Sequence, residues 1–178
     1  ATQLSLALAY LALSSGDSVH LHAGADGSRH QTWRRYQTRR DLGRLLNDLN
    51  ALQPTGGTDF PQAAKAFLNT RPTRGAVLLI SDLLDLPGVQ AGVTSLLQAG
   101  HELHLIHVLA PDELDPQVGA DLDLVCAETG AELSIVRDVS TVRAYREHVA
   151  SYLQQIMAYC LQHQVGYGLA LSDQPLED

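Results

Sequence analysis

The apolar positions of the first fifteen residues follow helical spacing. Leucines recur at intervals of three and four residues, as at Leu4, Leu8 and Leu11. The segment has no basic start and no small-residue cleavage site followed by a fresh start, so it does not resemble a signal peptide. Turn-forming residues from Ser14 to Asp17 end the pattern. We therefore expect a buried amphipathic helix over residues 1–15.

The pattern then changes to the alternation that is typical of strands. Residues 19–23 alternate apolar and polar side chains, which predicts a strand. Asp26-Gly27 is a hairpin turn signal, and residues 30–33 are the expected returning strand. Asp41 is the expected N-cap of a helix whose apolar face is formed by Leu42, Leu45, Leu46 and Leu49.

A continuous apolar run from Ala76 to Ile80 is bounded by Gly75 and Asp82. Such a run is typical of a strand covered on both faces, as in a parallel sheet. The other patterns predict helices over 59–67, 89–98 and 140–163 and strands over 103–109, 122–126, 133–136 and 167–171. Strands that alternate with helices predict an α/β fold, with a mostly parallel sheet flanked by helices and β-hairpins added.

Composition places these elements in one globular domain and excludes several classes of protein. The chain has 178 residues, of which 45% are hydrophobic, and this length needs no disulfide or metal staples. Its two cysteines, Cys126 and Cys160, are expected to be buried thiols of a reducing, cytoplasmic compartment. The chain has no run of about 18 apolar residues, so we expect no membrane contact from this segment. The net charge of -8 disfavours nucleic acid as a partner.

The charge is unevenly distributed along the chain. Residues 29–44 hold six arginines against one acid, Asp41, whereas residues 82–138 hold eleven acids against Arg137. One interpretation is a solvated strand edge and helix start, because charged side chains are mostly exposed. The other is a docking patch for an acidic protein partner. The candidate partner-binding residues of that patch are Arg34, Arg35, Arg39 and Arg40.

The chain lacks the common nucleotide-binding and nucleophile motifs. It contains no G-x-G-x-x-G, no phosphate-binding G-x-x-x-x-G-K-[ST], no G-x-S-x-G and no C-x-x-C. His101, His104 and His107 are spaced by three on an expected strand, where side chains alternate between faces and cannot converge on one metal. We expect these histidines to be exposed or hydrogen-bonded, and we assign no catalytic residue.

Oxygen-bearing side chains lie in two predicted loops. Asp82 comes directly after the strand over residues 76–81, and ligands of open parallel sheets bind at the carboxyl ends of strands. Thr58 follows two glycines in a loop before a helix. A hydroxyl and a carboxylate suit a hard cation such as Mg²⁺. The alternative is that Thr58 or Asp59 only caps the following helix and Asp82 caps its own loop.

These two segments resemble part of a known metal site. Gly56-Gly57-Thr58-Asp59-Phe60 and the run from Val77 to Asp82 match the later two parts of the metal-ion-dependent adhesion site of von Willebrand factor A domains. Four further segments are similar to markers of the domain-of-unknown-function fifty-eight family. These segments are Ser15-Gly16-Asp17-Ser18-Val19, Ala110-Pro111-Asp112-Glu113-Leu114, Asp123 to Gly130 and Ser172 to Glu177. Members of that family are von Willebrand A-like proteins encoded beside MoxR-type AAA+ ATPases. The resemblance covers essentially the whole chain and implies a single von Willebrand A-like domain over residues 1–178.

The metal site that the resemblance implies is incomplete in this chain. The family's site begins with an Asp-x-Ser-x-Ser loop after the first strand, and this chain begins at the helix that follows that loop. Thr58 and Asp82 match the remaining metal positions, so we expect Mg²⁺ to bind weakly, because affinity follows the number and charge of the ligands. The first strand would be central in the sheet, and its absence leaves its neighbours without ladder partners. We therefore expect an N-terminally incomplete domain, or one whose gap another segment or chain fills.

The resemblance implies a non-enzymatic binding module, an adaptor for a MoxR-type AAA+ ATPase or another protein. The alternative is a metal-dependent, phosphatase-like hydrolase with Asp82 as its nucleophile, because Asp82 and Asp85 follow a hydrophobic strand. Lys65, the only lysine of the chain, would then have to hold the phosphate. A third alternative is an inactive structural fragment, whose signature is an uncooperative melting transition.

Overall fold

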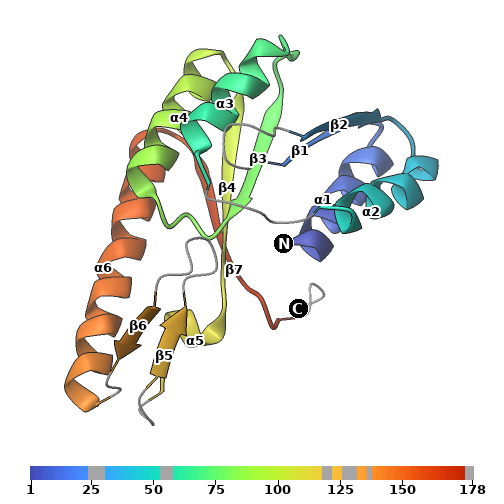
Figure 1. Cartoon of the computed structure of the whole chain (residues 1–178). Coiled ribbons are helices and arrows are strands. Elements are labelled where there is room, and N and C mark those ends of the chain that lie inside the picture. Colours follow the sequence, from blue (N-terminus) through green and yellow to red (C-terminus); the bar gives the residue numbers. More distant parts are fainter. Residues whose placement is uncertain (24–30, 53–57, 118–121, 126–131, 136–137, 175–178) are drawn as a thin grey trace. The chain divides into compact units, whose positions relative to one another are not determined.

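The chain forms two compact units. The computed structural model describes residues 1–23, 31–52, 58–117, 122–125, 132–135 and 138–174, with the backbone alone at 31–34, 122–125 and 132–135. Unit 1 comprises residues 1–74 and 87–101, and unit 2 comprises residues 75–86 and 102–178. Figure 1 shows the course of the chain through both.

Unit 1 is built from helices and one antiparallel hairpin. Its elements are α1 (Thr2–Ser14), β1 (Val19–Ala23), β2 (Gln31–Tyr36), the 3-10 helix η1 (Arg39–Asp41), α2 (Leu42–Asn50), α3 (Phe60–Asn69) and, from its second residue, α4 (Leu86–Gln98). β1 pairs antiparallel with β2, from Val19 opposite Tyr36 to Ala23 opposite Gln31. The predicted first helix and the pairing of the two strands are therefore confirmed, whereas the predicted turn at Asp26-Gly27 lies outside the described residues.

The core of unit 1 lies between α1, α2 and the hairpin. Leu13, Tyr36 and Leu45 are 4%, 0% and 1% exposed, and Ala9 and Leu49 are buried with them. The leucine spacing of α2 brings its buried positions onto one face, as its sequence pattern predicts. Each fully buried leucine contributes about 1.5–3 kcal/mol relative to an exposed one, so this cluster holds α1 and α2 side by side.

Asp41 does not cap α2, which corrects the prediction from the sequence. Its Oδ2 instead accepts hydrogen bonds from the backbone amides of Gln37 and Thr38, at 2.9 and 3.0 Å. Asp41 itself has helical dihedral angles, φ −77° and ψ −10°. The carboxylate therefore fixes the turn at η1, one step before α2. The predicted cap at Asp59 is confirmed, because its Oδ1 accepts from the amide of Gln62 at 2.9 Å.

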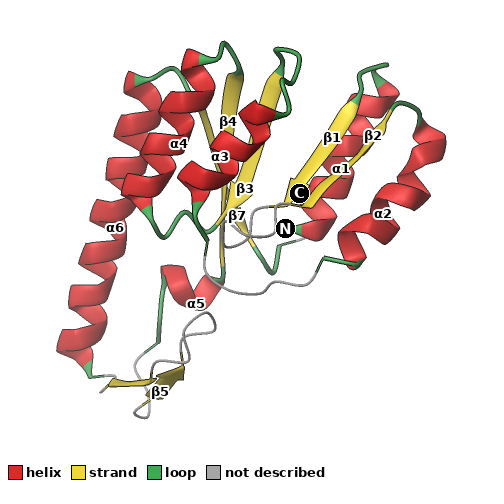
Figure 2. Cartoon of the chain, turned by 45° about the horizontal axis from the view of Figure 1, so that its top comes forward, coloured by secondary structure: helices red, strands yellow, loops and turns green. Residues whose placement is uncertain are grey.

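Unit 2 contains a parallel sheet and a long helix. Its elements are β3 (Ala76–Ser81), β4 (Glu102–Leu109), α5 (Pro111–Leu114), β5 (Leu122–Val125), β6 (Glu132–Ile135), α6 (Val139–Gln162) and β7 (Gly166–Leu171). The strand order is β3-β4-β7 with both pairs parallel, and β5 pairs with β6 as an antiparallel hairpin (Figure 2). The predicted α/β fold, a mostly parallel sheet with added hairpins, is confirmed.

The two faces of the parallel sheet differ in burial. Leu103, Leu105 and His107 of β4 are each 1% exposed, whereas the residues between them are half-buried. Cys160 of α6 lies near Tyr167 of β7, on the same face as these buried side chains. The face covered by α6 is therefore the core of unit 2.

β3 is an edge strand of its sheet. It pairs with β4 from Ala76 opposite Glu102 to Ser81 opposite His107 and, within the described residues, its other edge pairs with no strand. Leu78 is 45% exposed, so the prediction that this strand is covered on both faces is wrong. The run of apolar residues reports how hydrophobic the strand is and not how many neighbours it has. The expected central strand has no counterpart at this edge among the described residues.

Candidate functional site

The predicted metal residue Thr58 lies in unit 1, directly before α3. It is exposed, and the capping hydrogen bond of α3 comes from Asp59 rather than from Thr58. The second predicted metal residue, Asp82, lies in unit 2 at the carboxyl end of β3. Because the two residues belong to different units, their joint role as metal ligands stays a prediction.

The loop after β3 is fixed by short-range hydrogen bonds. Oδ1 of Asp82 accepts from the hydroxyl of Ser81 at 3.3 Å and, weakly, from the amide of Leu84 at 3.5 Å. The hydroxyl oxygen of Ser81 accepts in turn from the amide of Leu83 at 3.1 Å. Asp82 thus forms hydrogen bonds within its own loop, in line with the alternative that it caps this loop rather than binds a metal.

Leu83 adopts a left-handed backbone conformation, with φ +52°. A side chain disfavours this region by roughly 1 kcal/mol or more, so the surroundings must hold it in place. Leu83 is 1% exposed, and the hydroxyl of Tyr152 on α6 donates to its carbonyl oxygen. Strained residues that are held this firmly often occur at functional sites. Leu83 directly follows Asp82, so the space beside Asp82 is a candidate site.

A small pocket of about 80 Å³ opens beside Asp82 within unit 2. We call it the Asp82 pocket, and its lining residues are Asp82, Leu84, His107, Leu109, Glu113, Tyr145, Val149, Tyr152 and Leu153. It lies where β3 and β4 end, which is where ligands of open parallel sheets bind.

His107 is the buried polar group of the Asp82 pocket. Its Nδ1 lies 3.1 Å from the hydroxyl oxygen of Tyr167. Burial lowers the pKa of the imidazole, and a hydrogen bond with the backbone of Asp82, followed by the charges of Asp82 and Glu113, offsets part of that decrease. His107 is therefore a buried side chain, in contrast to the half-buried His104 on the opposite face of β4.

The donor set near Asp82 does not fit a metal centre. No three histidine, cysteine, aspartate or glutamate side chains cluster in a metal-binding arrangement anywhere in the described part of the chain. Oε2 of Glu113 already accepts a hydrogen bond from the amide of Ala110, at 2.6 Å. Divalent cations need several oxygen ligands, and the described side chains beside Asp82 do not supply them.

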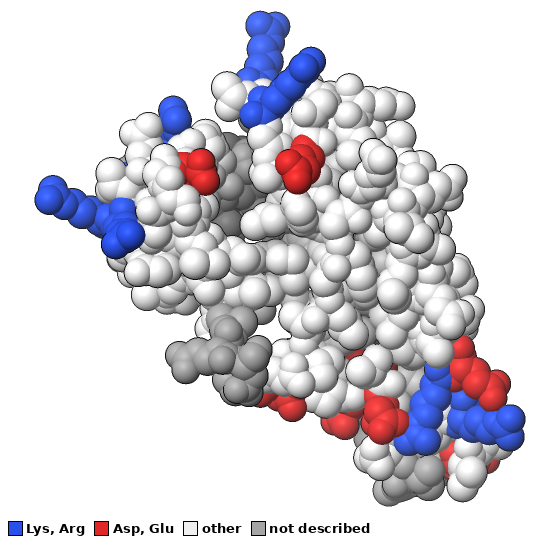
Figure 3. Space-filling view, turned by 180° about the vertical axis from the view of Figure 1, so that it is seen from behind, with Lys and Arg blue, Asp and Glu red and all other residues white. Residues whose placement is uncertain are grey.

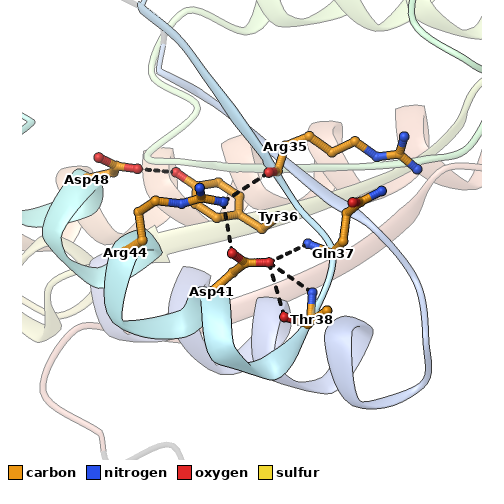
Figure 4. Close-up of polar contacts among 7 residues, drawn as sticks. All are labelled: Arg35, Tyr36, Gln37, Thr38, Asp41, Arg44 and Asp48. Carbon is orange, nitrogen blue, oxygen red and sulfur yellow. Dashed lines mark hydrogen bonds and ion pairs between the residues drawn. The ribbon is translucent and has the colours of Figure 1, made fainter.

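The predicted arginine patch lies at the end of β2 and in η1 of unit 1. Arg44, from α2, donates to the carboxylate of Asp41 at 3.0 Å and to the carbonyl of Arg35 at 3.2 Å, and it lies 5.1 Å from the ring centre of Tyr36. Figure 4 shows the guanidinium of Arg35 pointing away from this network. Asp41, the one acid among residues 29–44, is thus paired with Arg44 within unit 1.

The remaining arginines of the patch are available to solvent. Arg35, Arg39 and Arg40 are exposed, and we call these three the arginine surface. Arg35 donates to the hydroxyl of Ser18 at 3.2 Å, and Arg39 lies 5.8 Å from the ring centre of Tyr10. None of the three forms an ion pair with a described acidic residue. The side chain of the fourth predicted residue, Arg34, lies outside the described residues.

Charged side chains of unit 2 are arranged differently. At the end of this unit where α5 lies and α6 begins, acidic and basic side chains gather together (Figure 3). Arg146 pairs with Asp115 at 2.5 Å, and Arg143 pairs with Glu147 at 2.9 Å. Exposed pairs of this kind contribute about 0–1 kcal/mol. These two arginines are locally neutralised, whereas Arg39 and Arg40 are not.

The sequence missed most of the Asp82 pocket. Glu113 belongs to a segment that entered only through its family resemblance, and Tyr145 lies in the helix predicted over residues 140–163 without a role of its own. One available signal was that Asp82 and Glu113 each follow a strand of a parallel sheet, so both had to lie at its carboxyl edge. No signal could have placed His107, because a histidine on a strand can face either way.

Comparisons with known proteins bear on the fold and the family. No helix in the described ranges is both long and apolar enough to cross a membrane, and no curated protein sequence matches the chain. The chain is similar to the crystal structure of the conserved hypothetical protein BatB from Bacteroides thetaiotaomicron, with a TM-score of 0.51 and 12% identity, covering 95% of this chain and 79% of that one.

A second structural neighbour is an aerotolerance-related membrane protein from Bacteroides fragilis NCTC 9343 that carries multiple mutations to serine. It has a TM-score of 0.51 and 15% identity, and the match covers 95% of this chain and 80% of that one. At these identities both neighbours support the shared fold alone.

The sequence profile described as "Protein of unknown function DUF58" matches residues 1–155. That match extends over most of the chain, which therefore belongs to the DUF58 family.

Proposed function

We propose that this chain is a non-enzymatic protein-binding module that recognises an acidic protein through the arginine surface of unit 1. One observation carries the proposal: Arg39 and Arg40 are exposed and have no described acidic partner, while the acid beside them, Asp41, is bound to Arg44. The chain has a net charge of -8, so this basic surface differs in sign from the molecule as a whole.

Complementary charge contributes mainly to specificity and to the rate of association. Arginine suits this role because its planar guanidinium can bind a carboxylate through two hydrogen bonds. The field of the arginine surface is screened beyond about 8–10 Å at physiological salt. The proposal therefore requires direct contact with carboxylates, and binding should weaken as salt is added.

The partner that the family resemblance suggests is a MoxR-type AAA+ ATPase, and we adopt it as the first partner to test. A cytoplasmic setting, suggested by a sequence with two cysteines and by the free, buried thiol of Cys160, belongs to the same proposal. Any Mg²⁺ bound through Thr58 or Asp82 would be weak and is not needed for recognition through the arginine surface.

The test is a binding titration of the whole chain against a purified MoxR-type ATPase. Arg39→Glu and Arg40→Glu each reverse one charge of the arginine surface, and Lys65→Glu on α3 is the matched control, since it changes the net charge equally at an exposed site of the same unit. We expect each arginine reversal to weaken binding roughly fivefold, or about 1 kcal/mol, and the control to have no effect. Equal affinities for all four proteins would contradict the proposal.

A further inference from the structure

A groove runs between α1 and α2 on the surface of unit 1. It has a volume of about 420 Å³, and we call it the α1–α2 groove. Its lining residues are Gln3, Leu6, Ala7 and Tyr10 from α1 and Leu42, Gly43 and Leu46 from α2. Apart from Gln3, these residues present apolar or aromatic surface. Figures 1 and 2 both show α1 and α2 side by side.

The groove exposes more apolar surface than packing within unit 1 requires. Tyr10 and Leu46 are 47% and 38% exposed, and the adjacent Leu11 is 60% exposed. Leu6 and Leu42 of the groove pack against the core of unit 1, in which Leu13 and Leu45 are buried. A helix that is apolar nearly all round is usually covered on more than one side, and contiguous exposed apolar surface commonly marks a binding site.

Positive charge lies at one end of this groove. The guanidinium carbon of Arg39 is 5.8 Å from the ring centre of Tyr10, the last groove residue of α1. η1, which carries Arg39 and Arg40, leads directly into Leu42, the first groove residue of α2. The apolar groove and the arginine surface are therefore one continuous surface.

Gly43 leaves the floor of the groove open. A Cβ atom at this position would meet no atom within 4 Å, although glycine within a helix is less favourable than alanine by roughly 0.5–1 kcal/mol. The absent side chain lets the backbone of an occupant approach α2 closely. Two neighbouring helices with a groove between them form the natural seat for a third helix, which packs its ridge of side chains into that groove.

We propose that the α1–α2 groove receives an amphipathic helix of the acidic partner, with apolar side chains in the groove and carboxylates at Arg39 and Arg40. This inference rests on the proposed function and specifies the chemistry of its partner. Helix-in-groove binding places apolar anchors at positions i, i+3 or i+4 and i+7. The carboxylates would lie at the end of that apolar stripe that meets η1.

The test uses three synthetic peptides of about 18 residues, measured by fluorescence anisotropy against the whole chain. The first is a helix-forming peptide with leucines at helical spacing and glutamates at one end of the stripe. The second has the same composition with the leucine positions scrambled, and the third replaces every glutamate by glutamine. We expect the first peptide to bind at least tenfold more tightly than either of the others.

Variants of the chain separate the contributions of the groove and of the charge. Leu46→Gln removes an apolar contact, and Gly43→Gln places a side chain over the open floor while improving helical propensity. Because Gly43→Gln should not lower the melting temperature, it tests the groove even where Leu46→Gln proves unstable. Both variants should weaken binding of the first peptide at least tenfold, Arg39→Glu should do the same, and Lys65→Glu should not.

Three outcomes would overturn the inference, and they differ in what they say about the proposed function. If the scrambled acidic peptide binds as well as the first and only Arg39→Glu weakens it, the arginine surface binds acids without the groove, and the proposed function stands. If the glutamine peptide binds as well and only the groove variants weaken it, both proposals fail. If no peptide binds the folded chain, the inference fails, and the ATPase titration decides the proposed function separately.

Discussion

The hydrogen bond between Tyr36 and Asp48 joins β2 to α2 beneath the arginine surface. The hydroxyl of Tyr36 donates to Oδ2 of Asp48 at 2.5 Å, and the tyrosine ring is completely buried. Figure 4 shows this contact beside the network of Arg44 and Asp41. The replacement Tyr36→Phe removes the hydroxyl alone and leaves the ring in the core and under Arg44.

The magnitude of the effect follows from the charge of the acceptor. A hydrogen bond to a charged group contributes about 1.5–3 kcal/mol, and part of its loss is the cost of leaving the other partner unpaired. Asp48 is half-buried, so water replaces part of the lost interaction. We therefore expect Tyr36→Phe to lower the free energy of unfolding of unit 1 by about 1–2 kcal/mol.

The assay is urea unfolding followed through Trp33. This residue is the only tryptophan of the chain and lies on β2, so its fluorescence reports on unit 1. The matched control is Tyr10→Phe, which removes a hydroxyl from an exposed tyrosine and keeps the ring beneath Arg39. We expect that control to change stability by less than about 0.5 kcal/mol.

A shift of the Tyr36→Phe midpoint no larger than that of the control would refute the reasoning. A second check is Asp48→Asn, which keeps an acceptor but removes its charge. If the charge of Asp48 makes the bond strong, Asp48→Asn should lose part of the same free energy, and the double variant should lose less than the sum of the two.

Three further predictions concern unit 2. The amide of Thr141 and nearby hydroxyls hold the pKa of Asp138, the N-cap of α6, below its usual value of about 3.9. The carboxylate of Asp138 therefore stabilises the fold fully above that value, and this stabilisation is lost as the pH falls through the lower pKa of the folded state. In acid titrations followed by circular dichroism, the difference in stability between wild type and Asp138→Ala should therefore shrink towards low pH. Burial raises the pKa of the Cys160 thiol, so in a Cys126→Ser background a chromogenic disulfide reagent should react with it at neutral pH only after denaturation. Wild type and Asp82→Ala should show the same background rate with an aryl phosphate and Mg²⁺, whereas turnover that is lost in the variant would favour the hydrolase alternative.

Local pattern predicted most elements of this fold. The spacing of leucines in α2 and the alternation in β1 are properties of short segments, since side chains three or four residues apart share a helix face and alternate side chains share a strand face. Asp59 before α3 was a readable cap because its hydrogen bond closes within three residues. Asp41 also precedes a helix, but its carboxylate accepts a hydrogen bond from the preceding Gln37 and not from the helix that follows. The residue type alone does not show in which direction a carboxylate turns.

The candidate sites were predicted less completely. The arginine surface was visible as six arginines within sixteen residues, yet the sequence could not show that Arg44 is bound to Asp41 while Arg39 and Arg40 are not. The α1–α2 groove was not predicted, because it depends on the way in which two separate helices pack.

The sequence alone therefore determined the kinds of element, their order, the α/β class and the position of the basic stretch, because each depends on neighbours along the chain. Tertiary structure decided which apolar side chains stay exposed. β3 reads as a fully covered strand but lies at a sheet edge with Leu78 exposed, and Tyr10 reads as part of a buried helix but lines an open groove. Hydrophobicity measures how much a side chain gains from burial, whereas only the packing of distant segments determines whether anything covers it.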